Sequence, residues 1–169
     1  MTLLLPAGRK PDGLYRVCLV CLGNICRSPM AEVVLRSALE VAGLVESVIV
    51  DSAGTGDWHV GEPIYSRARA ALVKRGYDGS SHRSRQFDPA WFVSRDLILA
   101  MDSSNLADLL AMGGPGDRVL LFGEVGEIGE VPDPYGGSPA DFDHVLDLLE
   151  TAAPVVVRRL ERLLAPRPA

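Results

Sequence analysis

Cysteine is scarce in this chain of 169 residues, which contains only Cys18, Cys21 and Cys26. Three clustered thiols cannot supply the spread of paired cysteines that holds small secreted domains together. No cysteine and histidine stand at the spacing of a zinc site, so we expect no metal and no other cofactor. The sequence therefore favours a reducing, cytoplasmic location, with export left open.

Long hydrophobic runs and tracts of lysine are missing as well. Leu3-Leu4-Leu5 is too short for the core of a signal peptide, and no stretch approaches the length of a membrane span. A net charge of −5 without a basic run argues against a nucleic-acid partner. The length and the 47% hydrophobic content fit one domain with a substantial core, and we expect a monomer.

What the chain does contain is a thiol and an arginine separated by five residues, in Cys21-Leu22-Gly23-Asn24-Ile25-Cys26-Arg27-Ser28. A buried strand is predicted before this segment and a helix after it. The N–H groups of such a loop can curl around an anion, the helix N-terminus adds partial positive charge, and a guanidinium can grip two phosphate oxygens. The pattern predicts a site for a phosphate dianion, whose field also stabilises the Cys21 thiolate as a nucleophile.

Spacing alone leaves two interpretations open, because this pattern arises by chance and a lone cysteine at a strand end is more often part of the core. Local features favour catalysis. Gly23 and Asn24 suit left-handed backbone positions. Ser28 before Pro29 suits a helix N-cap, and apolar residues at helical spacing follow.

Strand and helix patterns alternate along the chain. Strands are predicted at residues 17–22, 48–51, 97–101 and 119–122, and helices at about 29–42, 65–75, 103–112 and 139–163. This order predicts an α/β fold, a single doubly wound domain with a parallel sheet and helices on both faces. We expect a flexible N-terminal extension over residues 1–13, the domain over residues 14–165 and a frayed tail over residues 166–169.

The loop and its surroundings, from Val20 to Glu32, resemble the signature of the low-molecular-weight protein tyrosine phosphatases. Further stretches agree in order and spacing, at residues 51–55, 58–61, 82–86, 96–102 and 133–135. The resemblance covers about residues 15–165. It implies a four-stranded sheet of order 2-1-3-4 and hydrolysis of phosphotyrosine in proteins through a phosphocysteine intermediate, with a tyrosine kinase as a candidate partner.

Three residues would carry this chemistry. Cys21 would be the nucleophile, and Arg27 would bind the phosphate. The backbone of the loop would bind it too, through Leu22, Gly23, Asn24, Ile25, Cys26, Arg27 and Ser28. Asp133, in the Asp-Pro-Tyr stretch, would be the general acid that protonates the leaving oxygen. From the residues alone, Pro132-Asp133-Pro134 is also compatible with a simple turn.

Four polar residues would brace the loop. Asn24 can hold a strained backbone through its side chain, and Ser28 can donate a hydrogen bond to the Cys21 thiolate. The resemblance adds Ser52 and His82 to this network, bonded to Asn24 and Ser28. By sequence alone, His82 is an ordinary loop histidine.

Other carboxylates have simpler explanations. Asp102 follows a strand and precedes two serines, so it is predicted to cap a helix, with a supporting role at the site as an alternative. Glu32 is placed in the first turn of the helix after the loop, where it would complement the helix dipole.

Trp58 and Tyr135 are predicted to form the walls of a cleft that holds a phenyl ring above the loop. The alternative for each is ordinary packing. The family usually shows two consecutive aromatic residues after the proline, whereas here Gly136 follows Tyr135. This departure leaves one wall undefined. The stretch over residues 123–131 is short and glycine-spaced compared with many relatives, which suggests that the segment carrying Asp133 is more mobile than usual.

Cys26 has two interpretations. It is either a small buried filler or a resolving thiol that captures oxidised Cys21 in a reversible disulfide. Cys18 is predicted to be an inert thiol of the core.

Three other functions compete with the tyrosine phosphatase. Protein arginine phosphatases of the same family usually have threonine where this chain has Ile25. An arsenate reductase would need a distal cysteine pair, and no cysteine follows Cys26. A non-catalytic phosphate-binding module would need neither Cys21 nor Asp133.

Overall fold

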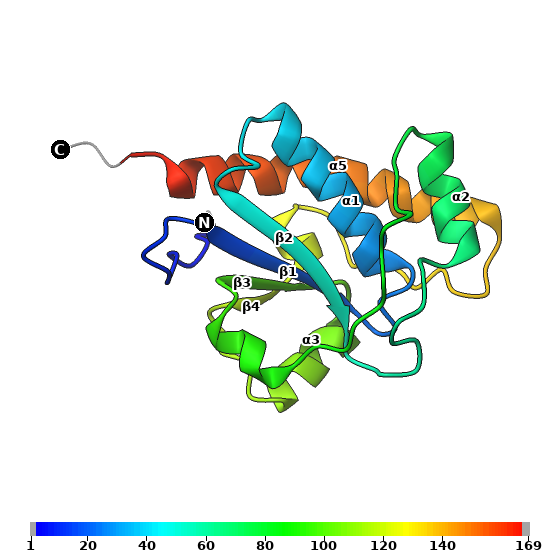
Figure 1. The fold of residues 1–169 in the computed structure, drawn as a ribbon, viewed down its shortest axis with the longest axis horizontal. Helices are drawn as coiled ribbons and strands as arrows, with labels where there is room; N and C mark the ends of the chain where they lie inside the picture. The colour runs from blue at the N-terminus through cyan, green and yellow to red at the C-terminus, as the bar shows by residue number, and fades with distance from the viewer. Residues whose placement is uncertain (1–2, 167–169) are drawn as a thin grey trace.

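A computed structural model describes residues 3–166, and it contains a parallel four-stranded sheet (Figure 1). The strands are β1 (Tyr15–Cys21), β2 (Val48–Gly54), β3 (Leu97–Ala100) and β4 (Val119–Leu121). Their order is β2-β1-β3-β4, which confirms the predicted topology. Residues 1–2 of the expected extension and 167–169 of the expected tail lie outside the described residues.

Helices cover both faces of the sheet, as predicted. One face carries α1 (Arg27–Val41), α2 (Ser66–Lys74), the short α4 (Phe122–Val125) and α5 (Pro139–Leu164). The other face carries α3 (Ser103–Ala111) and a 3-10 helix, η1 (Pro89–Val93). The two layers lie above and below the strands in Figure 1.

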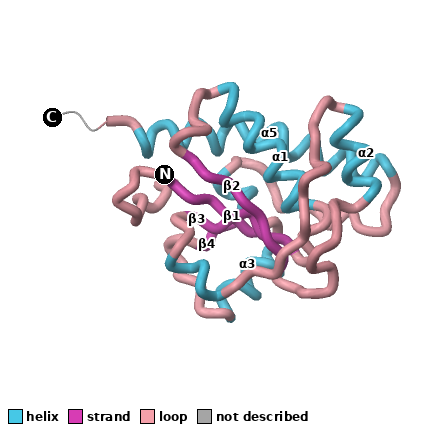
Figure 2. The backbone as a smooth tube through the Cα atoms, in the orientation of Figure 1, coloured by secondary structure: helices cyan, strands magenta, loops and turns pink. Residues whose placement is uncertain are grey.

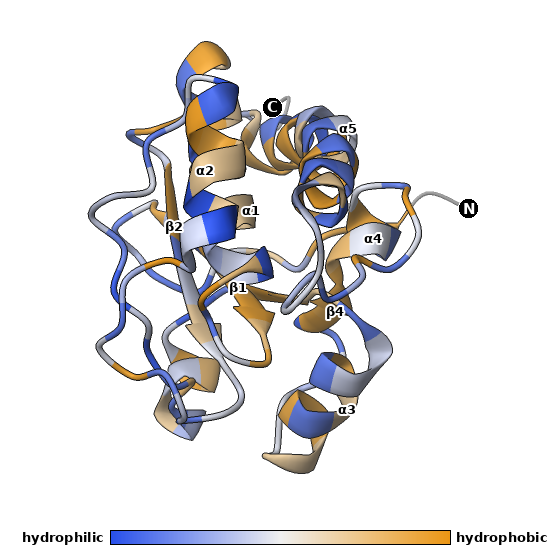
Figure 3. Cartoon of the chain, turned by 90° about the vertical axis from the view of Figure 1, so that its right-hand side faces the viewer, coloured by the Kyte–Doolittle hydropathy of each residue, from blue (hydrophilic) through white to orange (hydrophobic). Residues whose placement is uncertain are grey.

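Strand β1 shows why the sheet lies at the centre. Val17, Leu19 and Cys21 point into the core beneath α1 and α5, whereas Cys18 and Val20 point into the smaller core beneath α3. From Val17 to Cys21 every residue of β1 is apolar and buried, and because successive side chains alternate, both faces of this stretch are buried. The labelled β1 is orange, the hydrophobic end of the scale, in Figure 3.

The carboxyl ends of the neighbouring strands β1 and β2 are level with each other. Cys21, the last residue of β1, pairs in register with Gly54, the last residue of β2. The loops that leave these ends lie side by side in Figure 2. Ligands of open parallel sheets bind at this edge, so the fold places the Cys21 loop where a ligand is expected.

Most element boundaries differ from the sequence prediction by one to three residues, and two of these differences change the role of a residue. Helix α1 begins at Arg27, so Ser28 lies inside the helix and is not its N-cap. The predicted fourth strand includes Phe122, but this residue begins α4 instead. Both differences arise where a loop or strand passes directly into a helix, because the local pattern shows no break there.

The segment before β1, predicted to be a flexible extension, makes several contacts with the domain. Leu5 is buried, the Tyr15 hydroxyl donates to the carbonyl of Pro6 at 2.8 Å, and the Arg9 amide donates to Asp96 Oδ1 at 2.7 Å. The segment has no helix or strand, as its composition suggests, but its contacts tie it to the domain. Asp96 is 87 positions from Arg9, so the local pattern could not reveal this contact.

Helix α5 buries Phe142, Val145, Leu149, Ala152 and Val156, which recur at helical spacing. It continues through Pro154, which lacks the N–H that would bond to the carbonyl four residues earlier. Among the helices within residues 3–166, none combines the length and the apolar character needed to cross a membrane.

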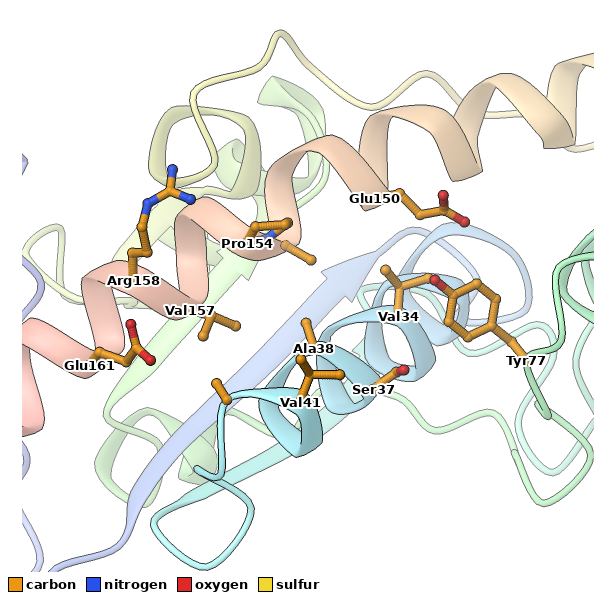
Figure 4. Close-up of a pocket in the computed structure, with 12 residues that line it drawn as sticks. Val34, Ser37, Ala38, Val41, Tyr77, Glu150, Pro154, Val157, Arg158 and Glu161 are labelled. Atoms are coloured by element: carbon orange, nitrogen blue, oxygen red, sulfur yellow. The ribbon is translucent and has the colours of Figure 1, made fainter.

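A groove of about 510 Å³ lies between α1 and α5 (Figure 4). Its walls are mainly apolar and include Val34, Val41 and Val157, with Pro154 on the α5 side. Tyr77 and Glu150 stand at one end of it. The groove is distinct from the Cys21 loop, since no residue of that loop lines it.

Candidate active site

The phosphate loop, defined here as residues 21–28, forms the floor of a cleft of about 150 Å³. Cys21 is only 3% exposed, at the end of β1. The cleft brings together residues from three separate parts of the chain. They are Cys21, Leu22, Gly23, Ile25, Cys26, Arg27, Trp58, His59, Asp133 and Tyr135.

Five successive carbonyl groups of the phosphate loop, from Cys21 to Ile25, accept hydrogen bonds from surrounding segments. The donors to the first three are the amides of Thr55 and Gly56, at 2.9 Å each, and the Ser84 hydroxyl, at 2.9 Å. The His82 ring donates to the carbonyl of Asn24 at 2.7 Å, and the Tyr65 amide donates to that of Ile25 at 2.9 Å. Because the carbonyls bond outward, the loop's N–H groups are left for an anion at its centre.

The Cys21 sulfur has two hydrogen-bonding neighbours. Ser28 Oγ lies 3.0 Å away, and the Asn24 amide donates to the sulfur at 3.3 Å. Both neighbours can stabilise a thiolate. The Ser28 side chain therefore serves the sulfur, and it does not cap α1.

Asn24 sets the direction of the hydrogen bonds behind the loop. Its backbone is left-handed, with φ of 55°, and its side-chain carbonyl accepts from the Arg85 amide at 2.9 Å. The side-chain NH₂ must then donate, to Ser28 Oγ at 2.8 Å and to Ser52 Oγ at 3.0 Å. Ser28 accepts from Asn24, so its own proton can point to the Cys21 sulfur.

His82 and Glu32 complete this network. His82 Nε2 donates to the carbonyl of Asn24, which fixes the tautomer, and burial lowers the pKa of its imidazole. Glu32 accepts from the Ser52 hydroxyl at 3.0 Å, and its carboxylate is 3.9 Å from His82 Nδ1. Glu32 lies beyond the first turn of α1, so the predicted dipole role was wrong.

Arg27 is 2% exposed and is held from behind. Its Nη1 donates to Asp102 Oδ2 at 2.5 Å and to the carbonyl of Val131 at 3.0 Å. With Nη1 engaged, the Nε–Nη2 edge is the one that can grip two phosphate oxygens. Asp102 also accepts from the Asn105 amide at 2.8 Å, so it both caps α3, as predicted, and orients Arg27.

Asp133 comes from the acid loop, defined here as residues 131–138. Its Oδ2 is 3.6 Å from Arg27 Nη2, and its Oδ1 accepts from the Tyr135 amide at 3.1 Å. The side chain is 44% exposed. A carboxyl group at the rim of the cleft, turned toward the arginine, can reach the leaving oxygen of a bound phosphate.

The predicted walls, Trp58 and Tyr135, both line the cleft and are 68% and 58% exposed. The Trp58 ring covers Gly56, where a Cβ atom would lie 1.8 Å from the ring. Exposed aromatic rings beside a cleft are suited to hold an aromatic ligand.

Sequence reasoning missed His59 as a wall of the cleft. Its Nδ1 lies 2.8 Å from Glu62 Oε2, and its ring centroid is 6.2 Å from that of Tyr135. The one signal in the sequence was its position next to Trp58.

The other two thiols lie in different surroundings. Cys18 is fully buried in the core beneath α3, and burial and Asp51 raise the pKa of its thiol. Cys26 lines the cleft with Cys21. Burial, and then the charges of Cys21 and Asp133, raise the pKa of the Cys26 thiol. A raised pKa keeps the Cys26 thiol protonated, and a protonated thiol is a poor nucleophile.

Comparisons with known proteins agree with this geometry. The family model for low molecular weight phosphotyrosine protein phosphatases matches residues 16–165. A low molecular weight protein-tyrosine-phosphatase of Streptomyces coelicolor is 44% identical over 149 residues, covering 82% of this chain and 89% of the relative.

Solved structures share the fold. A protein tyrosine phosphatase from Entamoeba histolytica has a TM-score of 0.83 at 38% identity, with 88% of this chain and 97% of that chain covered. The YwlE arginine phosphatase has a TM-score of 0.80 at 32% identity, with coverage of 88% and 99%. The family model spans nearly the whole described domain, and the chain belongs to the low-molecular-weight phosphotyrosine protein phosphatase family.

Proposed function

We propose that this protein hydrolyses phosphotyrosine in protein substrates through a phosphocysteine intermediate, without a metal or other cofactor. The observation that carries the proposal is the outward bonding of five loop carbonyls around the Cys21 sulfur. This arrangement leaves backbone N–H groups, the Arg27 guanidinium and a thiol directed at one phosphate-sized position.

In the first step, the Cys21 thiolate attacks phosphorus and the bond from phosphorus to the phenolic oxygen breaks. The loop N–H groups and Arg27 hold the equatorial oxygens. Asp133, in its protonated form, gives its proton to the departing phenolate. The Ser28 hydroxyl, 3.0 Å from the sulfur, stabilises the thiolate before attack.

In the second step, water attacks the phosphorus of the phosphocysteine. Asp133 is now a carboxylate and takes a proton from that water. The sulfur–phosphorus bond breaks, inorganic phosphate leaves and the thiolate is restored. The hydrogen bond from Ser28 then favours departure of the sulfur as an anion.

The supporting residues act on the loop. Asn24, Ser52 and Glu32 keep the Ser28 proton directed at the sulfur, and His82 holds the left-handed turn at Asn24. Trp58 and Tyr135 hold the phenyl ring of the substrate above the loop.

Cys26 would protect the site against oxidation. Peroxide would convert the Cys21 thiolate into a sulfenic acid, and Cys26 would displace water from it to form a disulfide. A neutral sulfenic acid at Cys21 also removes one of the charges that raise the pKa of Cys26.

We also propose that the enzyme acts as a cytoplasmic monomer that opposes a tyrosine kinase. All three cysteines are free and buried, which suits a reducing compartment. Size-exclusion chromatography with light scattering tests the monomer, and a dimer at micromolar concentration would contradict it.

A direct assay separates the candidate functions. The purified protein is given matched peptides that carry phosphotyrosine, phosphoarginine or phosphoserine, and released phosphate is measured. We expect turnover of the phosphotyrosine peptide to exceed the others. Preference for phosphoarginine would assign the arginine phosphatase activity, and binding without turnover would assign a non-catalytic module.

A further inference from the structure

Tyr65 stands directly before α2 and contacts both catalytic loops. It occupies the N-cap position but makes no side-chain cap bond, since a phenol is a poor substitute for the short polar side chains that cap helices. Its backbone amide donates to the carbonyl of Ile25 in the phosphate loop at 2.9 Å. The main chain of Tyr65 is therefore fixed to the phosphate loop.

The ring of Tyr65 faces the acid loop. Its centroid lies 5.2 Å from the Tyr135 ring, at 47°, and 5.7 Å from the Phe142 ring, at 30°. Phe142 is fully buried in α5, so it gives the Tyr65 ring a rigid support. Tilted rings at these distances attract each other beyond simple burial.

Tyr135 needs such support. Gly136, which follows it, has a positive φ of 76°, and a Cβ atom placed there would have no neighbour within 4 Å. Position 136 therefore provides no side-chain contact that could hold this part of the loop. The amide of Tyr135 is also the group that donates to Asp133 Oδ1.

We propose that Tyr65 is a positioning residue for acid catalysis. Through Tyr135, it holds Asp133 at a fixed position relative to the phosphate loop. Its amide is bound to the loop that holds the phosphate, and its ring is packed on the residue whose amide orients the acid. The inference rests on the proposed role of Asp133. The phenolic oxygen plays no part in it, since ring contacts alone are used.

The test uses Tyr65→Ala, Tyr65→Leu and Tyr65→Phe, with Tyr77→Ala as the matched control. Tyr77 is also half-buried against the main core, but it lies at the α1–α5 groove beside Val34 (Figure 4). The measured quantity is kcat/KM, which reports the step in which the leaving group departs. Phenyl phosphate needs a proton on its leaving oxygen, whereas 2,4-dinitrophenyl phosphate needs none.

We expect Tyr65→Ala and Tyr65→Leu to lower kcat/KM for phenyl phosphate roughly 3- to 10-fold, the loss that corresponds to one aromatic pair. With 2,4-dinitrophenyl phosphate the loss should be less than about twofold, and vanadate should bind as in the wild type. Tyr65→Phe and Tyr77→Ala should keep the wild-type ratio of the kcat/KM values for the two substrates. In an Asp133→Asn background, Tyr65→Ala should have no further effect on this ratio.

The outcomes separate the two proposals. Equal losses on both substrates, or damage by Tyr65→Phe equal to that by Tyr65→Leu, would overturn the role of Tyr65. If Asp133→Asn shows the leaving-group pattern and Tyr65→Leu does not, the acid assignment stands and this inference fails. If Asp133→Asn lacks the pattern, the proposed acid itself is wrong. Should Tyr65→Ala fail to fold, Tyr65→Leu gives the decision.

Discussion

The phosphate loop and the acid loop meet in one cleft, but they are held in different ways. Five carbonyls of the phosphate loop are bonded from behind, and Asn24, Arg27 and Ser28 are almost completely buried. The acid loop is tied near its ends, by Val131 to Met101 and by Arg67 to the carbonyl of Gly137. Between these ties, Asp133 and Tyr135 are exposed.

This difference matches the proposed tasks of the two loops, which are to bind a phosphate dianion and to transfer a proton. A dianion is bound by dipoles that are already oriented, so the groups around it must not reorganise during the reaction. The loop that carries the proposed acid must admit the substrate ring, and Asp133 must approach the leaving oxygen and later face water. An exposed segment between two anchors can do this. Rigidity is therefore concentrated where charge develops.

The largest expected effect comes from the phosphate loop. Cys21→Ser should lower kcat by roughly 10³-fold or more, because the hydroxyl is not an anion at neutral pH. Vanadate or phosphate should still bind, since the N–H groups and Arg27 remain. Turnover within tenfold of the wild type would contradict the assignment of Cys21, and equilibrium titration with phosphate provides the binding control.

A change in the acid loop should affect mainly the substrates whose leaving group needs a proton. Asp133→Asn should lower kcat by roughly 10²–10⁴, the usual contribution of acid–base catalysis. The loss in kcat/KM should shrink for leaving groups that need no proton, and phosphate affinity should hardly change. Equal losses for all leaving groups would point to damage of the cleft and would remove the distinction between the loops.

The oxidation response tests the phosphate loop by other means. Brief peroxide treatment should inactivate the wild type reversibly, with activity restored by a thiol and a Cys21–Cys26 disulfide found by peptide mapping. Cys26→Ser should recover poorly, because the sulfenic acid can then be oxidised further. Cys18→Ser is the matched control and should recover like the wild type. A Cys18–Cys21 bridge would refute the resolving role of Cys26.

The smallest effect concerns the bracing behind the loop. Burial lowers the pKa of His82 from 6.5, so below that pH the unfolded chain binds a proton that the folded protein resists. Stability should fall as pH drops from about 6.5 to the lowered value, and should be unaffected by this group above 6.5. His82→Gln keeps a donor for Asn24 but cannot titrate.

Urea unfolding at pH 7.5 and 5.5 measures this difference. The wild type should lose stability relative to His82→Gln on going to pH 5.5. A stability difference between the two proteins that is the same at both pH values would show that the titration of His82 does not contribute.

The sequence revealed the parts of the molecule that depend on local order. The strand, loop and helix around Cys21 form one continuous stretch, so their pattern predicted the phosphate site, and alternating strands and helices predicted the sheet. It could not show that Glu32 reaches Ser52, because that contact joins α1 to β2 across 20 positions.

Contacts between other distant segments were hard to predict for the same reason. The contact between Arg27 and Asp102 spans 75 positions, and the ring contacts of Tyr65 depend on how α2 and α5 are placed. His59 and Tyr65 belong to no motif that local patterns can detect. Their place at the cleft depends on the tertiary structure, which brings the three loops together.

The most direct test of the account is to trap the phosphorylated enzyme. The protein is mixed with an excess of an activated aryl phosphate, quenched in acid within milliseconds and examined by intact mass and peptide mapping. The account predicts one phosphoryl group on Cys21, formed in a burst of phenol release and lost as phosphate appears. A phosphoryl group on another residue, or turnover in which no phosphorylated enzyme accumulates even when water attack is slowed by Asp133→Asn, would contradict it.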